Sequence, residues 1–226
     1  MNRAQELAAN LADVRARMEA ACERAGRSDD VTLIAVTKTW PLSDVRLLRD
    51  LGVTEFGENR DQEAQPKAAA LAAADGRSAH WHFIGQLQSN KARSVVSYAH
   101  LVHTVDRPSL LDALLRAARA PLDCLVQLSV DGDPRRGGMP REGVLDLAGR
   151  MEGLLRLRGI MAVSPLDMDP SRAFAVVAEV HAELLERFPE AGIRCIGMSD
   201  DFEAAIEKGA THIRVGSALL GPRPVP

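Results

Sequence analysis

Apolar positions follow two alternating patterns along this chain. Residues 3–25 carry apolar side chains at helical spacing, with charged residues on the other face and Gly26 where a helix would end. Residues 31–37 (VTLIAVT) then form a short β-branched run that is typical of a buried parallel strand. Helical stretches and short apolar runs alternate through the rest of the sequence, which indicates an α/β fold.

The alternation contains eight strand–helix units without a long linker or a break in composition. We expect strands at 32–37, 53–57, 81–85, 101–105, 123–130, 157–163, 193–197 and 212–216. Helices are expected between them at 43–51, 59–73, 88–98, 108–119, 141–153, 171–188 and 200–208. This order predicts a parallel sheet closed into a (β/α)8 TIM barrel, with residues 1–226 as a single domain. A doubly wound open sheet is the alternative, but no G-x-G-x-x-G motif follows the first strand.

Composition narrows the class of protein without identifying it. The chain has 28 Lys+Arg against 31 Asp+Glu, which argues against a strongly basic nucleic-acid-binding protein. No apolar run approaches the roughly 20 residues that span a bilayer, and no signal peptide is visible. The three cysteines lie far apart and form no C-x-x-C pair, so we expect neither a disulfide framework nor a zinc site. We therefore predict a cytoplasmic protein with no metal, nucleic acid or membrane as a partner.

Candidate chemistry gathers where the predicted strands end, which is where barrels carry their active sites. Lys38 directly follows the first strand. Partial burial there would lower the lysine pKa and leave a free amine able to form a Schiff base; a solvated loop lysine is the alternative. Glu58 and Asn59 follow the second strand and could both face a ligand, but for Asn59 we favour capping of the next helix.

The last two strands end in groups that suit a phosphate. Ser199 precedes a helix, where its hydroxyl and the free backbone N–H groups could bind phosphate, or it could be a simple N-cap. Arg214 and Gly216 share one strand face, and an inward arginine needs an anionic or acceptor partner; a surface salt bridge is the alternative. Together with Lys38, these groups suggest a phosphorylated carbonyl compound.

Other polar positions are better explained by structure than by chemistry. His80 and His82 alternate onto one strand face, but no third ligand has suitable spacing, so we favour hydrogen-bonded structural histidines over a metal pair. His181 lies on the apolar side of its helix and is expected to be a satisfied core histidine. The stretch 135–138 (RRGG) could take an anion, and we favour a solvated turn.

Several motifs in this order resemble the pyridoxal-phosphate homeostasis protein family over almost the whole chain. They are 33–38 (LIAVTK), 56–60 (FGENR), 81–91 (WHFIGQLQSNK), 197–201 (GMSDD), Ala205, Ile206, Gly209 and 213–216 (IRVG). The resemblance implies a barrel like the N-terminal domain of alanine racemase that binds pyridoxal 5′-phosphate (PLP). Ala210 and Ser217 depart from the serine and threonine that are usual there, and 135–136 (RR) replaces a stretch that contains lysine.

The resemblance also implies a role for individual residues. Lys38 would be the Schiff-base lysine, Arg214 would face the pyridine nitrogen, and Asn59 would lie beside the ring. The remaining cofactor-binding residues would hold the phosphate, namely the backbone near Met198, and Ser199, Gly216 and Ser217.

These roles predict a non-catalytic or weakly catalytic protein that stores or delivers PLP in vitamin B6 homeostasis. An arginine opposite the pyridine nitrogen leaves it unprotonated, which weakens the ring as an electron sink. Tyr98, the one tyrosine, falls before a strand rather than after one, and 226 residues leave no room for the second domain of such racemases. PLP-dependent apo-enzymes are candidate recipients, and we expect a monomer or weak dimer. The alternatives are a racemase using Lys38 and a histidine, and a cofactor-free aldolase using Lys38.

Overall fold

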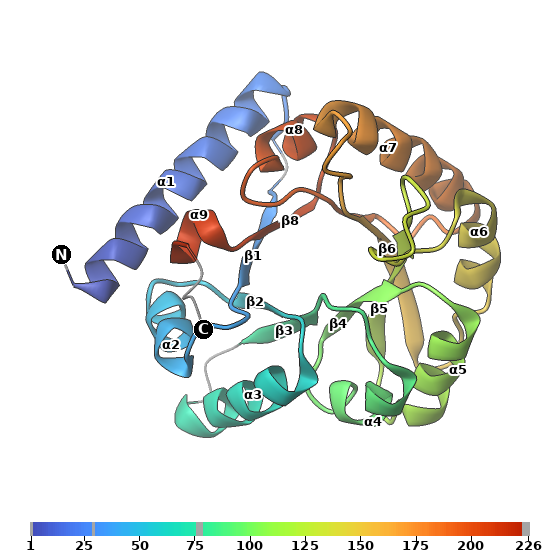
Figure 1. Cartoon of the computed structure of the whole chain (residues 1–226), viewed down its shortest axis with the longest axis horizontal. Coiled ribbons are helices and arrows are strands. Elements are labelled where there is room, and N and C mark those ends of the chain that lie inside the picture. Colours follow the sequence, from blue (N-terminus) through green and yellow to red (C-terminus); the bar gives the residue numbers. More distant parts are fainter. Residues whose placement is uncertain (1, 29, 76–78, 223–226) are drawn as a thin grey trace.

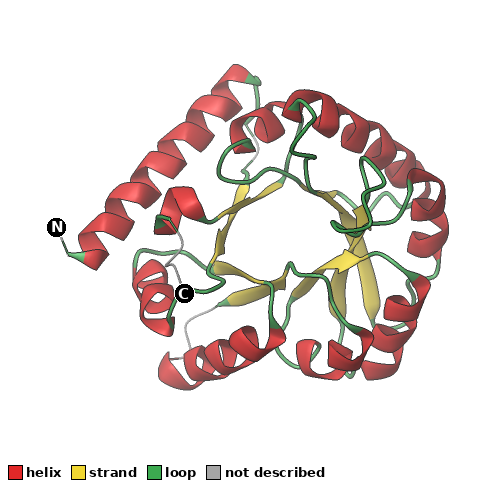
Figure 2. Ribbon diagram, viewed as in Figure 1, coloured by secondary structure: helices red, strands yellow, loops and turns green. Residues whose placement is uncertain are grey.

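Eight parallel strands close into a barrel, in a computed structural model that describes residues 2–28, 30–75 and 79–222. Neighbours in sequence are neighbours in the sheet, and β8 pairs with β1 to close the ring (Figure 1). Helices surround the strands on the outside (Figure 2). The predicted (β/α)8 barrel is confirmed, and the open-sheet alternative is wrong.

The elements follow the predicted order. The strands are β1 (Thr32–Val36), β2 (Glu55–Glu58), β3 (His80–Phe83), β4 (Leu101–Val105), β5 (Leu122–Leu128), β6 (Leu155–Ala162), β7 (Ile193–Cys195) and β8 (His212–Val215). The helices are α1 (Arg3–Arg24), α2 (Leu42–Asp50), α3 (Asp61–Asp75), α4 (Ala92–Val95), α5 (Pro108–Ala117), α6 (Arg141–Gly149), α7 (Pro170–Arg187), α8 (Phe202–Glu207) and α9 (Ser217–Leu220).

Alternation along the strands divides the apolar residues into two clusters. The smaller one fills the barrel and contains Ile34, Leu101, Leu125, Met161 and Cys195. The larger one lies mostly between the strands and the surrounding helices. In β2, a Cβ on Gly57 would lie 3.1 Å from Ile34, so Gly57 faces the interior while its neighbours face α3.

The N-terminal helix takes the place of a full eighth outer helix. The helix that follows β8 is only the single turn α9, and α1 packs over α8 and α9 on that side of the barrel (Figure 1). The buried stripe of α1 includes Leu7, Leu11 and Val14, and Asn10 Nδ2 donates to Leu219 O at 3.0 Å. Gly26 follows the helix with φ of +63°, as predicted for its C-terminal end.

Four helices are shorter than predicted, namely those expected at 88–98, 108–119, 141–153 and 200–208. The predicted helix 88–98 is a 3-10 turn (Ser89–Lys91) followed by α4, and it ends at Val95. The Ser97 hydroxyl donates to Ser94 O at 2.6 Å, which competes with the backbone hydrogen bonds of a helix. The predicted helix 200–208 begins only at Phe202. Within the described ranges, no helix is both long and apolar enough to cross a membrane.

Candidate functional site

A cavity of about 250 Å³ opens at the carboxyl ends of β1, β7 and β8. Six of the seven predicted site residues line it: Lys38, Met198, Ser199, Arg214, Gly216 and Ser217. Val36, Trp40, Ile84, Asp200 and Gly221 complete the lining. Residues as far apart in the sequence as Lys38 and Ser217, which are separated by 179 positions, therefore meet at the mouth of the barrel.

Lys38 lies in a tight, strained turn after β1. Trp40 N donates to Thr37 O at 3.1 Å across the turn, and Lys38 itself is half-buried. Thr39 has φ of +69°, the only non-glycine residue with positive φ among those described. A β-branched residue rarely adopts this conformation, and such strain tends to occur at functional sites. The Thr39 N–H donates to Glu63 Oε2 at 2.9 Å, which helps to hold the turn.

Arg214 lies inside the barrel with its guanidinium fixed by backbone carbonyls. It is 4% exposed, its Nη1 donates to Cys195 O at 3.0 Å, and its Nη2 donates to Ala162 O at 2.9 Å. The described part of the chain contains no salt bridge to it, so the surface-salt-bridge alternative is wrong and the expected acceptor partners are present. A buried positive charge thus sits in the lining of the cavity.

Ser199 joins the loops that follow β7 and β8. Its Oγ accepts from Gly216 N at 3.1 Å and from Ala218 N at 3.3 Å. Because α8 begins at Phe202 with Asp201 as its N-cap, the interpretation of Ser199 as an N-cap is wrong. The hydroxyl instead stands at two backbone N–H groups that are chemically suited to a phosphate oxygen.

The loop after β7 also carries acidic groups. Asp201 does not line the cavity, and its Oδ1 accepts from Met198 N at 2.6 Å. Burial raises the pKa of Asp201, although this hydrogen bond and the Arg214 charge act in the opposite direction. Asp200 lines the cavity, so of the two aspartates only Asp201 is held outside the lining by a backbone hydrogen bond.

Asn59 lines a neighbouring cavity rather than this one. That cavity, of about 480 Å³, lies beside the ends of β2 to β5 and also contains Gln86, Lys91 and Arg107. Helix α3 begins at Asp61, with its first hydrogen bonds to Arg60 O, so the prediction that Asn59 caps this helix is wrong. Its Oδ1 is buried and has no hydrogen-bond partner among the described residues.

Sequence reasoning missed a buried polar network behind Lys38. The Thr37 hydroxyl donates to Glu58 Oε1 at 2.7 Å, and Lys67 Nζ donates to the same oxygen at 2.7 Å and to Thr37 O at 3.0 Å. Burial raises the pKa of Glu58, even though Lys67 lies beside it. The available signal was the position of Lys67, which shares a helical face with the buried Ala64 and Leu71.

The histidines have structural partners. His82 hydrogen-bonds His103 at 2.8 Å and Glu55 at 2.7 Å, and His80 hydrogen-bonds Glu55 at 2.7 Å. Both histidines are therefore hydrogen-bonded to the Glu55 carboxylate, as expected for structural histidines. Within the described residues, no group of three or more His, Cys, Asp or Glu could hold a metal ion. His181 is 2% exposed and bonds Ala191 O at 2.7 Å, which confirms a satisfied core histidine.

The remaining two candidates are also structural. Residues 134–136 form the predicted turn, in which Arg135 pairs with Asp133 and Arg136 pairs with Asp131. Tyr98 lies outside the barrel, where its hydroxyl donates to Asp61 Oδ1 at 3.3 Å. Burial, followed by the Asp61 charge, raises the pKa of Tyr98.

Comparison with known proteins places this architecture in a family. The alanine racemase N-terminal domain family matches residues 9–224. The pyridoxal phosphate homeostasis proteins of Mycobacterium leprae and Escherichia coli K12 are 40% and 38% identical to this chain. The alignments cover 98% and 96% of this chain, and 94% and 97% of those proteins. The chain belongs to the pyridoxal phosphate homeostasis protein family.

Solved structures agree with this assignment. This PLP homeostasis family member is similar to Synechococcus elongatus PipY with PLP bound, with a TM-score of 0.81 and 32% identity over 95% of this chain and 100% of PipY. Alanine racemase of Corynebacterium glutamicum shares the fold, with a TM-score of 0.70 and 15% identity, and the match covers 100% of this chain and 64% of the racemase.

Proposed function

We propose that this protein binds PLP in the mouth cavity through Lys38 and stores or delivers it without substantial turnover. The observation that carries the proposal is the convergence of the Lys38 amine, the buried Arg214 guanidinium and the Ser199 hydroxyl on one cavity. When bound, PLP supplies an aldehyde that amines attack and a ring that withdraws electrons. The donors in this cavity suit the aldehyde, the ring nitrogen and the phosphate of that molecule.

Each lining residue then has a separate task. Lys38 presents a primary amine at the mouth, where the strained turn fixes its backbone. Ser199 and the N–H groups near Gly216, with Met198 and Ser217 beside them, would surround the phosphate. Arg214 would face the pyridine nitrogen and, as a permanent cation, would leave that nitrogen without a proton. Asn59, with its unpartnered Oδ1, would reach the ring from the neighbouring cavity.

Weak or absent catalysis follows from the groups that surround Lys38. Racemisation needs a second acid–base group across the ring from the lysine. Tyr98 is held by Asp61 outside the barrel and does not line the cavity. None of the histidines lines the cavity either. Apo-enzymes that require PLP are therefore the proposed recipients of the cofactor.

Reduction with borohydride tests the attachment. Wild-type protein incubated with PLP should become yellow and, after reduction, carry a fixed phosphopyridoxyl group on the peptide that contains Lys38. Lys38→Ala should show neither the band nor the label. Lys91→Ala is the matched control, because Lys91 lines the neighbouring cavity and its loss should leave both unchanged. Label retained by Lys38→Ala would refute the assignment.

Turnover distinguishes a carrier from a racemase. The loaded protein should exchange the α-hydrogen of amino acids for deuterium no faster than free PLP does, and it should restore activity to a PLP-requiring apo-enzyme. Rapid exchange that disappears in Lys38→Ala would instead favour the racemase.

A further inference from the structure

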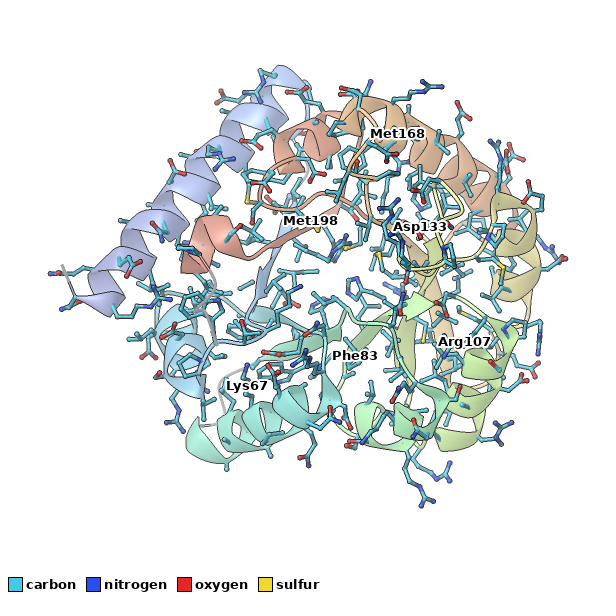
Figure 3. All side chains as sticks on the ribbon, in the orientation of Figure 1. Lys67, Phe83, Arg107, Asp133, Met168 and Met198 are labelled. Carbon is cyan, nitrogen blue, oxygen red and sulfur yellow. The ribbon has the colours of Figure 1, made fainter. Side chains whose placement is uncertain are left out.

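We propose that Glu58 and Lys67 are positioning residues that hold the Lys38 turn from behind the barrel wall, an inference that rests on the proposed role of Lys38. Neither residue lines the mouth cavity. In Figure 3, Lys67 lies on α3, next to the strands. These two buried charges thereby support the covalent capture of PLP rather than its recognition.

The network lies on the outer face of the strands. Val36 and Gly57 face the interior, where a Cβ on Gly57 would lie 3.6 Å from Val36 Cγ2. By alternation, Thr37 and Glu58 face outward, toward α3. Thr37, Glu58 and Lys67 are 0%, 1% and 9% exposed, so none of them is open to a ligand in the cavity.

Two side chains of α3 hold the peptide groups on either side of Lys38. Lys67 Nζ donates to Thr37 O at 3.0 Å, which fixes the peptide that precedes Lys38. Glu63 Oε2 accepts from Thr39 N at 2.9 Å, which fixes the peptide that follows it. The left-handed conformation of Thr39 is unfavourable by itself and persists only where its surroundings impose it. These hydrogen bonds therefore set the direction in which Lys38 leaves the turn.

The buried ion pair between Glu58 and Lys67 contributes little net stability to the fold, because both charges lose their hydration. Glu58 and Lys67 are both removed from water, and Glu58 Oε2 has no hydrogen-bond partner among the residues described. Apolar residues of similar volume often stabilise a protein as well as a buried ion pair does. A lysine, however, donates to Glu58 and to the Thr37 carbonyl at once, and an apolar side chain cannot hold that carbonyl.

The test compares two ligands that differ only in the reacting group. Pyridoxine 5′-phosphate has the ring and phosphate of PLP but carries a hydroxymethyl group instead of the aldehyde, so it cannot bond covalently to a lysine. Lys67→Met should weaken PLP binding by about tenfold, the equivalent of one lost charged hydrogen bond, and leave pyridoxine phosphate affinity unchanged. Lys208→Met, at an exposed position, should change neither affinity.

Glu63 provides a second route to the same result, in case Lys67→Met does not fold. Glu63→Ala removes the acceptor for Thr39 N and should also weaken PLP selectively, whereas Glu63→Gln keeps an acceptor and should restore PLP binding. Equal loss of both ligands in Lys67→Met, or PLP binding as tight as wild type in Lys67→Met and Glu63→Ala, would overturn the proposal. Lys38→Ala distinguishes a failure of this positioning role from a failure of the proposed function. A Lys38→Ala protein that binds PLP as wild type does would refute the proposed function itself.

Discussion

At the scale of single residues, Ser199 connects the two loops that close the mouth cavity. Its hydroxyl accepts from the N–H groups of Gly216 and Ala218. Ser199→Ala should weaken PLP and pyridoxine phosphate to the same extent, about tenfold, because both ligands carry the phosphate. Equilibrium titration of the two ligands measures this. Ser97→Ala is the matched control, since that hydroxyl donates to Ser94 O and does not line the cavity. Selective loss of PLP alone in Ser199→Ala would contradict the phosphate assignment.

Residues that end a strand could be found from the sequence, and residues that act across elements could not. Lys38 and Arg214 stand at or beside strand ends, so the barrel prediction alone placed them near the mouth. Ser199 was recognised as a candidate, but its partners were not, because Gly216 N and Ala218 N belong to another loop. Lys67 was missed although its spacing from Ala64 and Leu71 places it on the buried face of the helix, because its acceptors, Thr37 O and Glu58 Oε1, belong to other elements.

At the scale of elements, the pairing of β5 with β6 contains an irregularity that only glycine permits. Cys124 pairs with Leu157 but Leu125 pairs with Gly159, so β6 has one extra residue there. Gly159 has φ of +148°, and a Cβ at this position would lie 1.9 Å from Ile193 O in β7. The prediction of a strand at 157–163 had the right location but could not detect the bulge, because the extra residue depends on both neighbouring strands.

A substitution at this bulge tests how rigid it is. Gly159→Ala should lower the free energy of unfolding by about 2 kcal/mol or more, because the new methyl group can fit only if β6 and β7 move apart. Gly192→Ala is the matched control, since no atom lies within 4 Å of the Cβ it would add. Urea denaturation of both variants measures the difference. Equal stability of the two would mean that the strands separate easily.

At the scale of the whole molecule, one buried and one half-buried histidine connect folding to pH. Burial, followed by the charge of His82, lowers the pKa of His212 from 6.5 to about 4, and burial also lowers the pKa of His103. Between the ordinary histidine pKa of 6.5 and the lowered pKa in the folded protein, the unfolded chain binds protons that the folded chain does not. Stability is therefore complete above about pH 6.5 and falls as the pH decreases, by up to about 1.4 kcal/mol per pH unit for each such proton.

Glu55 extends the loss of stability to lower pH. Burial would raise its pKa, but the hydrogen bonds and charges of His82 and His80 outweigh burial and lower the pKa to about 2. Its contribution to stability is present above the ordinary value of 4.5 and disappears as the pH falls toward 2. Urea denaturation from pH 7.5 to 5 measures the histidine effect, because Glu55 keeps its full contribution over that range. His212→Gln should reduce the slope of unfolding free energy against pH by the contribution of one proton. An unchanged slope would mean that other groups cause the pH dependence.

The packing of α1 over α8 and α9 has a consequence for the order in which this protein folds. Asn10 bonds Leu219 across 209 positions of the sequence, and Arg17 bonds Glu203 across 186. Because ribosomes make α1 long before α8 and α9, the buried stripe with Leu7, Leu11 and Val14 lacks the cover of these helices until both have emerged. Contacts of such long range form slowly. The nascent chain therefore exposes the apolar stripe of α1 until α8 and α9 have been made, although α1 itself is made long before them.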